Sequence, residues 1–170
     1  MKILGIVPAK SKSYRFPGKN KILFKDNVLA MKDSRQFDDI IVASDDFYIL
    51  HDSKYKLKVG TWERSLVEIE LNLPLIDVLK QVYLAQNKSY THIICVFGCT
   101  YGLVSENISS MVAKMASDNS LKEVRSFDLN GFENGMFMLT VDRLLEGHIS
   151  SYIGCVHSSM AEIHTEDQLQ

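Results

Sequence analysis

The sequence has no apolar stretch long enough for export or membrane insertion, and few cysteines. The apolar run at residues 1–7 ends at Pro8 and is far too short for a signal segment or a membrane span. The three cysteines, an odd number, show neither a CxxC pair nor a cysteine–histidine metal spacing, so we expect no disulfide framework and no zinc site. These absences predict a cytoplasmic protein with reduced thiols.

An excess of one charge is also missing. The chain has 19 basic and 21 acidic residues, a formal net charge of -2, which gives no general attraction to a nucleic acid polymer or a membrane surface. Hydrophobic residues make up 46% and charged residues 24%, a composition that excludes disorder and coiled coils. The length of 170 residues predicts a single domain, residues 1–170.

Short apolar runs alternate with helical patterns along the chain. We expect buried strands at residues 2–7, 39–43, 92–97, 135–140 and 152–156. We expect helices at residues 74–85, 105–116 and 141–146, with Ser105 as the N-cap of the second. The alternation predicts an α/β fold with a mostly parallel sheet flanked by helices.

Cationic side chains gather in the loop that follows the first predicted strand. They are Lys10, Lys12, Arg15, Lys19 and Lys21. In open α/β sheets ligands bind beyond the carboxyl ends of the strands, and these cations suit a phosphate there. The loop has neither the Walker A spacing nor a GxGxxG pattern, so composition alone also allows a solvated basic loop.

The order of residues in this loop resembles the signature of the sugar cytidylyltransferases. Pro8-Ala9-Lys10 and Ser13 to Asn20 are similar to the phosphate loop of the CMP-acylneuraminate and CMP-ketodeoxyoctonate synthetases. Residues 37–46, 134–137 and 162–167 resemble three further segments of that family, in the same order. The resemblance implies a nucleotide-diphospho-sugar transferase-like fold, a Rossmann-like three-layer sandwich.

The resemblance also implies an activity and a set of site residues. CMP would pass from CTP to an acidic sugar with release of pyrophosphate, in surface polysaccharide biosynthesis. The implied catalytic residues are Arg15 and Lys19, which would hold the triphosphate. The implied nucleotide-binding residues are Ala9, Lys10, Ser13, Arg15, Lys19, Asn20, Phe97, Cys99 and Thr100. The implied substrate-binding residues are Asp45, Asp46, Asn134 and Gly135, and the implied ligands of Mg²⁺ or Mn²⁺ are Glu162 and His164.

Some positions depart from the family pattern and leave a second interpretation open. Glu162 and His164 replace an Asp-x-Asp pair, and imidazole suits Mg²⁺ less well than carboxylate does. Residues 97–103 lack the base-reading Gln and the terminal Arg of the family, and residues 118–134 are too few for its dimerisation insert. The alternative is a non-catalytic nucleotide- or sugar-binding or regulatory protein on the same fold, and no oligomeric state is predicted.

Several implied site residues also have ordinary structural interpretations. Asp45 and Asp46 follow an apolar run, where acids cap a helix as often as they bind a ligand. No histidine is placed by the sequence to activate Cys99, which favours packing over a nucleophilic role. Phe97 and Tyr101 suit either base stacking or burial.

Overall fold

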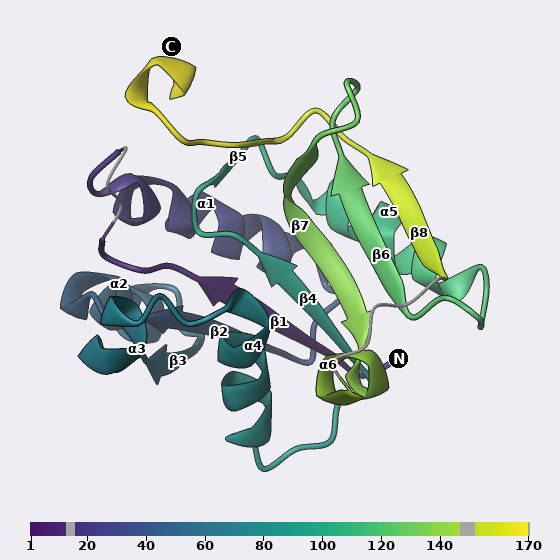
Figure 1. Cartoon of the computed structure of the whole chain (residues 1–170), viewed down its shortest axis with the longest axis horizontal. Helices are drawn as coiled ribbons and strands as arrows, with labels where there is room; N and C mark the ends of the chain where they lie inside the picture. The colour runs from purple at the N-terminus through teal and green to yellow at the C-terminus, as the bar shows by residue number, and fades with distance from the viewer. Residues whose placement is uncertain (13–15, 147–151, 170) are drawn as a thin grey trace.

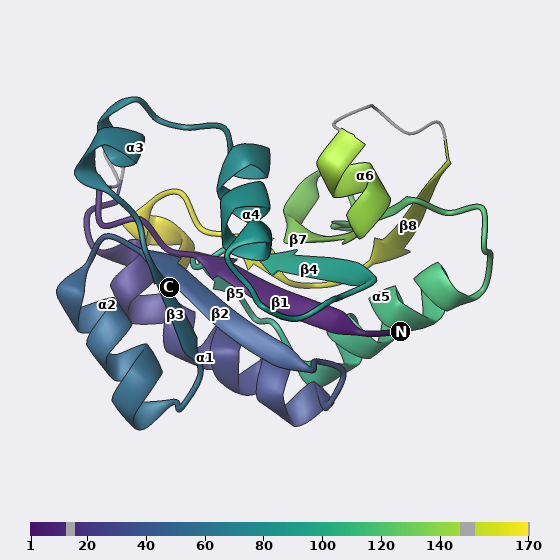
Figure 2. The same cartoon turned by 90° about the horizontal axis from the view of Figure 1, so that it is seen from below.

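The computed structural model describes residues 1–12, 16–146 and 152–169, and it has three layers. A central sheet is covered on one face by α1, α2 and α5 and on the other by α4 and α6 (Figure 2). The helices are α1 (Lys19–Ser34), α2 (Phe47–His51), α3 (Leu66–Glu70), α4 (Leu75–Leu84), α5 (Ser105–Ala116) and α6 (Val141–Glu146), with a π-helical turn η1 (Asp52–Lys56) and a 3-10 turn η2 (Glu166–Leu169). The predicted α/β sandwich is confirmed.

Seven strands form the central sheet in the order β3-β2-β1-β4-β7-β6-β8. They are β1 (Ile3–Pro8), β2 (Asp39–Ser44), β3 (Gly60–Glu63), β4 (His92–Val96), β6 (Glu123–Phe127), β7 (Glu133–Thr140) and β8 (Ile153–His157). A second sheet pairs β5 (Thr100–Tyr101) with β9 (Ala161–Glu162). Figure 1 shows the C-terminal segment returning from β8 past β5, at the edge where β1 and β4 end.

All neighbours in the central sheet are parallel except β7, which is antiparallel to both β4 and β6. A short turn between β6 and β7 explains this reversal, because only antiparallel strands can be joined by so few residues. Asp128 fixes the turn by accepting the backbone N–H groups of Asn130 and Phe132 at 2.8 and 2.9 Å. The start of β7 therefore lies at the same sheet edge as the ends of β1 and β4.

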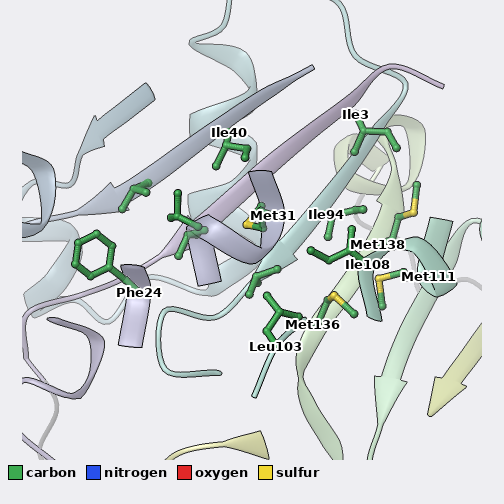
Figure 3. Close-up of a cluster of buried hydrophobic side chains, with 14 of the residues drawn as sticks. Ile3, Phe24, Met31, Ile40, Ile94, Leu103, Ile108, Met111, Met136 and Met138 are labelled. Atoms are coloured by element: carbon green, nitrogen blue, oxygen red, sulfur yellow. The ribbon is translucent and has the colours of Figure 1, made fainter. Parts of the chain in front are cut away.

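The core consists of apolar side chains on both faces of the sheet. On one face Phe24 and Met31 of α1 and Ile108 and Met111 of α5 are buried against the strands (Figure 3). On the other face Val78, Leu79 and Val82 of α4 and Leu144 of α6 pack on β1 and β4. Strands covered on both faces are apolar throughout, which is why β1, β2 and β4 were recognisable as continuous apolar runs.

The expected strands and helices are present within one or two residues, with one correction. Ser105 does not cap α5: the N-cap is Val104, and Ser105 is the first helical residue. The Asn107 side-chain oxygen accepts the Val104 N–H at 3.0 Å. A side chain in the first turn thus provides a hydrogen-bond partner for the backbone N–H of the N-cap residue. Within the described residues, no helix is both long and apolar enough to cross a membrane.

Candidate functional site

A cavity of about 310 Å³ lies at the carboxyl edge of the sheet. Its lining includes six of the residues implicated by the sequence, namely Lys10, Lys19, Asn20, Phe97, Cys99 and Glu162. Pro8, Arg64 and a mostly apolar wall at residues 72–75 and 78 complete the described lining. We call this space the phosphate-loop cavity. Ser13 and Arg15 fall outside the described residues.

The loop after β1 is held down by close backbone contacts. The Ala9 N–H donates to the Ala43 carbonyl at 2.8 Å, and the Gly98 N–H donates to the Pro8 carbonyl at 3.0 Å. A Cβ on Gly98 would lie 2.9 Å from the Ala9 Cβ, so this approach requires glycine. Ala9 is fully buried and therefore supports the loop from beneath; it is not among the residues lining the cavity.

Side chains from neighbouring segments hold the start of the same loop. The Ser44 hydroxyl donates to the Ala9 carbonyl at 2.6 Å, and the Asn20 amide donates to the Lys10 carbonyl at 2.7 Å. Asp45 accepts the Ser11 N–H at 2.7 Å and also the Ser11 hydroxyl. Asp45 thus positions the loop from outside the cavity.

Asp46 has the structural role that the sequence left as an alternative. It is the N-cap of α2, and its carboxylate accepts the N–H groups of Tyr48 and Ile49 at 2.7 and 3.1 Å. An N-cap carboxylate also complements the helix dipole. Neither Asp45 nor Asp46 lines the phosphate-loop cavity.

Hydrogen bonds to the protein position both lysines of the cavity. Gly18, with a φ of 78°, turns the chain into α1, so Lys19 is the first helical residue. The Lys19 ammonium donates to the Ile163 carbonyl at 2.7 Å, and the Lys10 ammonium donates to the Asn72 side chain at 3.1 Å. Each ammonium has three N–H groups, so capacity for an anionic ligand remains.

Arg64 is a third cation of this cavity, and it was not anticipated from the sequence. It follows β3, its N–H donates to the Ser44 carbonyl at 2.9 Å, and it is only 7% exposed. Its Nε is buried with no hydrogen-bond partner among the described residues. Burial lowers the pKa of the guanidinium, although Glu68 and Asp45 oppose that shift. A buried guanidinium with an unused donor is costly without an anionic partner.

Cys99 is a packing thiol within the cavity wall. Burial raises its pKa to about 11, with Lys19 opposing the shift and Glu162 adding to it. The Cys99 Sγ lies 3.7 Å from the Glu162 Oε1 as a weak donor. The thiol is therefore protonated at neutral pH, which agrees with the packing interpretation. Phe97 lines the cavity and also packs edge-on against Phe137 at 6.2 Å.

The two residues implied as metal ligands lie together but form an incomplete donor set. The His164 Nδ1 is 3.8 Å from the Glu162 Oε1. No group of three His, Cys, Asp or Glu side chains suited to a metal ion occurs in the described part of the chain. Mg²⁺ prefers octahedral oxygen coordination, and a single carboxylate beside an imidazole fits it poorly.

Three other implicated residues lie beside the cavity instead of lining it. The Thr100 hydroxyl donates to the Gly135 carbonyl at 3.1 Å, and Gly135 has a φ of +92° that favours glycine. The Asn134 amide donates to the Ser158 hydroxyl at 2.9 Å. These contacts join β5 and the C-terminal segment to β7, and so support the wall that carries Glu162.

Comparisons with known proteins show what this architecture resembles. No family model matches the sequence, and no curated protein gives a significant match. A CMP:2-keto-3-deoxy-manno-octonic acid synthetase in complex with CTP has a similar structure, with a TM-score of 0.75 at 12% identity over 99% of this chain and 95% of that one.

Two further solved structures are also similar. 4-Diphosphocytidyl-2C-methyl-D-erythritol synthase from Anaerococcus prevotii has a TM-score of 0.67 at 12% identity, covering 99% of this chain and 94% of that one. Glucosyl-3-phosphoglycerate synthase from Mycobacterium tuberculosis, in complex with Mn²⁺, UDP and glucosyl-3-phosphoglycerate, has a TM-score of 0.69 at 13% identity, covering 99% and 74%. The chain therefore has the three-layer α/β fold of the nucleotide-diphospho-sugar transferases.

Proposed function

We propose that the protein is a nucleotidyltransferase that transfers CMP from CTP to an acidic sugar and releases pyrophosphate, for surface polysaccharide synthesis. The observation that carries the proposal is the convergence of Lys10, Lys19 and Arg64 at one cavity, each from a different segment of the chain. A similar structure is that of a synthetase complexed with CTP, which supports CTP as the nucleotide.

Three positive side chains suit the charge changes of this reaction. The anomeric oxygen of the sugar bonds to the α-phosphorus of CTP, and the bond from that phosphorus to pyrophosphate breaks. Catalysis of such a transfer depends on positioning and on cations placed where the leaving group gains charge. In this proposal Lys19 and Arg64 hold the triphosphate, Arg15 joins them from the same loop, and Phe97 offers a face on which the base stacks.

A second candidate function is the binding of a nucleotide or a sugar without transferase activity. The Glu162 carboxylate is already engaged by the Cys99 thiol, and the described donors do not complete a Mg²⁺ site. A nucleotide- or sugar-binding or regulatory protein would need the cations and could dispense with the metal. The two functions therefore differ in whether CTP is turned over. The same measurements test the expectation that Mg²⁺ or Mn²⁺ is a cofactor.

Two measurements on the purified chain separate these functions. The first is thermal unfolding with CTP, ATP, GTP or UTP, each with and without Mg²⁺ or Mn²⁺. A ligand at 100 times its dissociation constant stabilises the native state by about 2.7 kcal/mol, or roughly 5–10 °C for a domain of this size. The second is pyrophosphate release from CTP in the presence of N-acetylneuraminate or 3-deoxy-manno-octulosonate.

The outcomes are distinct. Stabilisation selective for CTP together with pyrophosphate release supports the transferase. Stabilisation without release across sugars and metals supports the binding protein. No stabilisation by any nucleotide at millimolar concentration contradicts the transferase and favours a non-catalytic sugar-binding or regulatory protein.

A further inference from the structure

Three aromatic rings form a row on the solvent side of α2 and η1. Phe47, His51 and Tyr55 follow one another at intervals of four residues, with ring centroids 5.9 Å and then 4.8 Å apart. Phe47 is 71% exposed and Tyr55 is 62% exposed. Surface helices normally present polar side chains to water, whereas contiguous exposed apolar groups mark a binding surface.

The row borders a second cavity, of about 290 Å³, which we call the aromatic cavity. Its other wall is polar and comes from the ends of β2 and β3, with Asp45, Thr61 and Glu63. Ligand pockets begin at about 300 Å³, so this cavity suits a ligand of one ring rather than a dinucleotide. Its residues take no part in the phosphate-loop cavity.

The polar wall sets the charge of the ligand. Ionised carboxylates only accept hydrogen bonds, so Glu63 requires a ligand rich in donors. Asp45 already accepts two hydrogen bonds from Ser11, and its remaining lone pairs can accept further donors. No described side chain forms a hydrogen bond or ion pair with Glu63, which leaves its carboxylate available. The two carboxylates outnumber the single ammonium of Lys54 in the described lining, so the cavity disfavours a phosphate or an acidic sugar.

We propose that the aromatic cavity binds a neutral or amino sugar in its pyranose form. Such a ring has a face of C–H groups that can lie on Phe47 and Tyr55, and a rim of hydroxyl or ammonium donors for Asp45 and Glu63. Lys54 lines the same cavity with its ammonium 5.4 Å from the Tyr55 ring centroid, where it can donate to a sugar oxygen. An apolar peptide would instead desolvate both carboxylates without pairing them.

The site is independent of the nucleotide chemistry proposed for the other cavity. Glu63 and Arg64 are consecutive, yet Glu63 lines the aromatic cavity and Arg64 the phosphate-loop cavity. Opposite charges thus face two adjacent spaces. A failure of CTP binding leaves the sugar proposal intact, and the reverse also holds.

The test is saturation-transfer NMR on the full chain with methyl glucoside, methyl mannoside, glucosamine and methyl glucuronide as probes. We expect transfer to the neutral and amino sugars and none to the glucuronide. The double variant Phe47→Ala/Tyr55→Ala should weaken binding at least about tenfold, because both stacking faces are lost. Glu63→Gln should weaken glucosamine binding more than methyl glucoside binding.

Tyr48→Ala is the matched control. Tyr48 is 63% exposed on the same helix and touches the Phe47 ring edge-on, but it does not line the cavity, so its loss should weaken sugar binding far less than the double variant does. The proposal is overturned if no neutral or amino sugar binds at tens of millimolar, if the glucuronide binds as well as the glucoside, or if Tyr48→Ala matches the double variant. All substituted aromatic residues are exposed, so the variants should remain folded.

Discussion

The phosphate-loop cavity and the aromatic cavity lie at the same end of the strands but are built in opposite ways. In the first, charged groups are held in place before any ligand arrives: Lys10 and Lys19 are each hydrogen-bonded, and Arg64 is buried. In the second, rings such as Phe47 stand exposed and acids such as Glu63 face them. Without a ligand, the first cavity destabilises the protein through a buried charge. The second destabilises it through apolar surface exposed to water.

This difference shows how one sheet edge can serve two kinds of ligand. An anion relieves the cost of the buried guanidinium, so binding at the first cavity should be strong and sensitive to single charges. A sugar only covers surface that water can also wet, so binding at the second should be weak and spread over several groups.

The largest expected effect follows loss of Lys19. A hydrogen bond to a charged group contributes about 1.5–3 kcal/mol, so Lys19→Ala should weaken CTP binding by roughly tenfold to a hundredfold in calorimetry. Lys12→Ala is the matched control, since Lys12 is an exposed cation of the same loop. Sugar binding at the aromatic cavity should not change in either variant. Equal small losses of CTP affinity in both variants would mean that the loop attracts the ligand only through its diffuse positive charge.

Arg64→Met should separate binding from stability. Replacing a buried, incompletely paired charge by an apolar side chain is often neutral or stabilising, so urea unfolding without ligand should show no loss. CTP affinity should nevertheless fall about tenfold, because a charge-assisted contact is removed. A large loss of stability with unchanged CTP affinity would make Arg64 a structural residue and remove it from the site.

Smaller effects are expected where the two cavities meet, at Asp45. Ser11→Ala removes the hydroxyl hydrogen bond to Asp45 and keeps the bond from the backbone N–H, so it should weaken CTP binding by about 1 kcal/mol, or roughly fivefold, without affecting sugar binding. Asp45→Asn alters the same loop contact and also the wall of the aromatic cavity, so it should weaken both ligands. If Asp45→Asn leaves sugar binding intact, the polar wall does not act as proposed.

The smallest expected effect is a difference in labelling rate between two thiols, and it can be measured on the unaltered protein. Cys155 is exposed, whereas burial raises the pKa of Cys99 to about 11. Only the thiolate reacts, so at pH 8 Ellman's reagent should label Cys155 first, and labelling of Cys99 should rise only as the pH climbs toward its raised pKa. Bound CTP should slow the labelling of Cys99. Rapid labelling of Cys99 near neutral pH would contradict its burial in the cavity wall.

The sequence predicted the central strands and the core helices α4 and α5, but it predicted neither α1 nor the sheet edge. Polar residues such as Asn27 are buried on α1 and obscure its apolar spacing. β1, β2 and β4 are continuous apolar runs because helices cover both faces, and α4 and α5 show clear helical spacing. β3 was missed because it is an edge strand of four residues that begins with glycine and is largely exposed. β6 was missed because Glu123 and Arg125, paired with each other inside the sheet, conceal its apolar pattern.

The residues of the candidate site were likewise only partly predictable from the sequence. The residues of the phosphate loop could be located because they are consecutive in sequence, and Lys10, Lys19 and Asn20 do line one cavity. Arg64 could not be located, since an isolated arginine carries no signal until the strand before it is known. The rings of α2 and η1 were missed because their spacing of four residues became meaningful only once the helix and its exposed face were known.

The C-terminal segment makes the cavity depend on a part of the chain that lies outside the central sheet. All seven strands of the central sheet end by His157, but Glu162 and the Ile163 carbonyl that accepts from Lys19 come later in the chain. Local opening costs less free energy in such peripheral segments than in a packed core, so this segment can detach while the sheet stays folded. Mild denaturant should therefore abolish the site before it unfolds the domain.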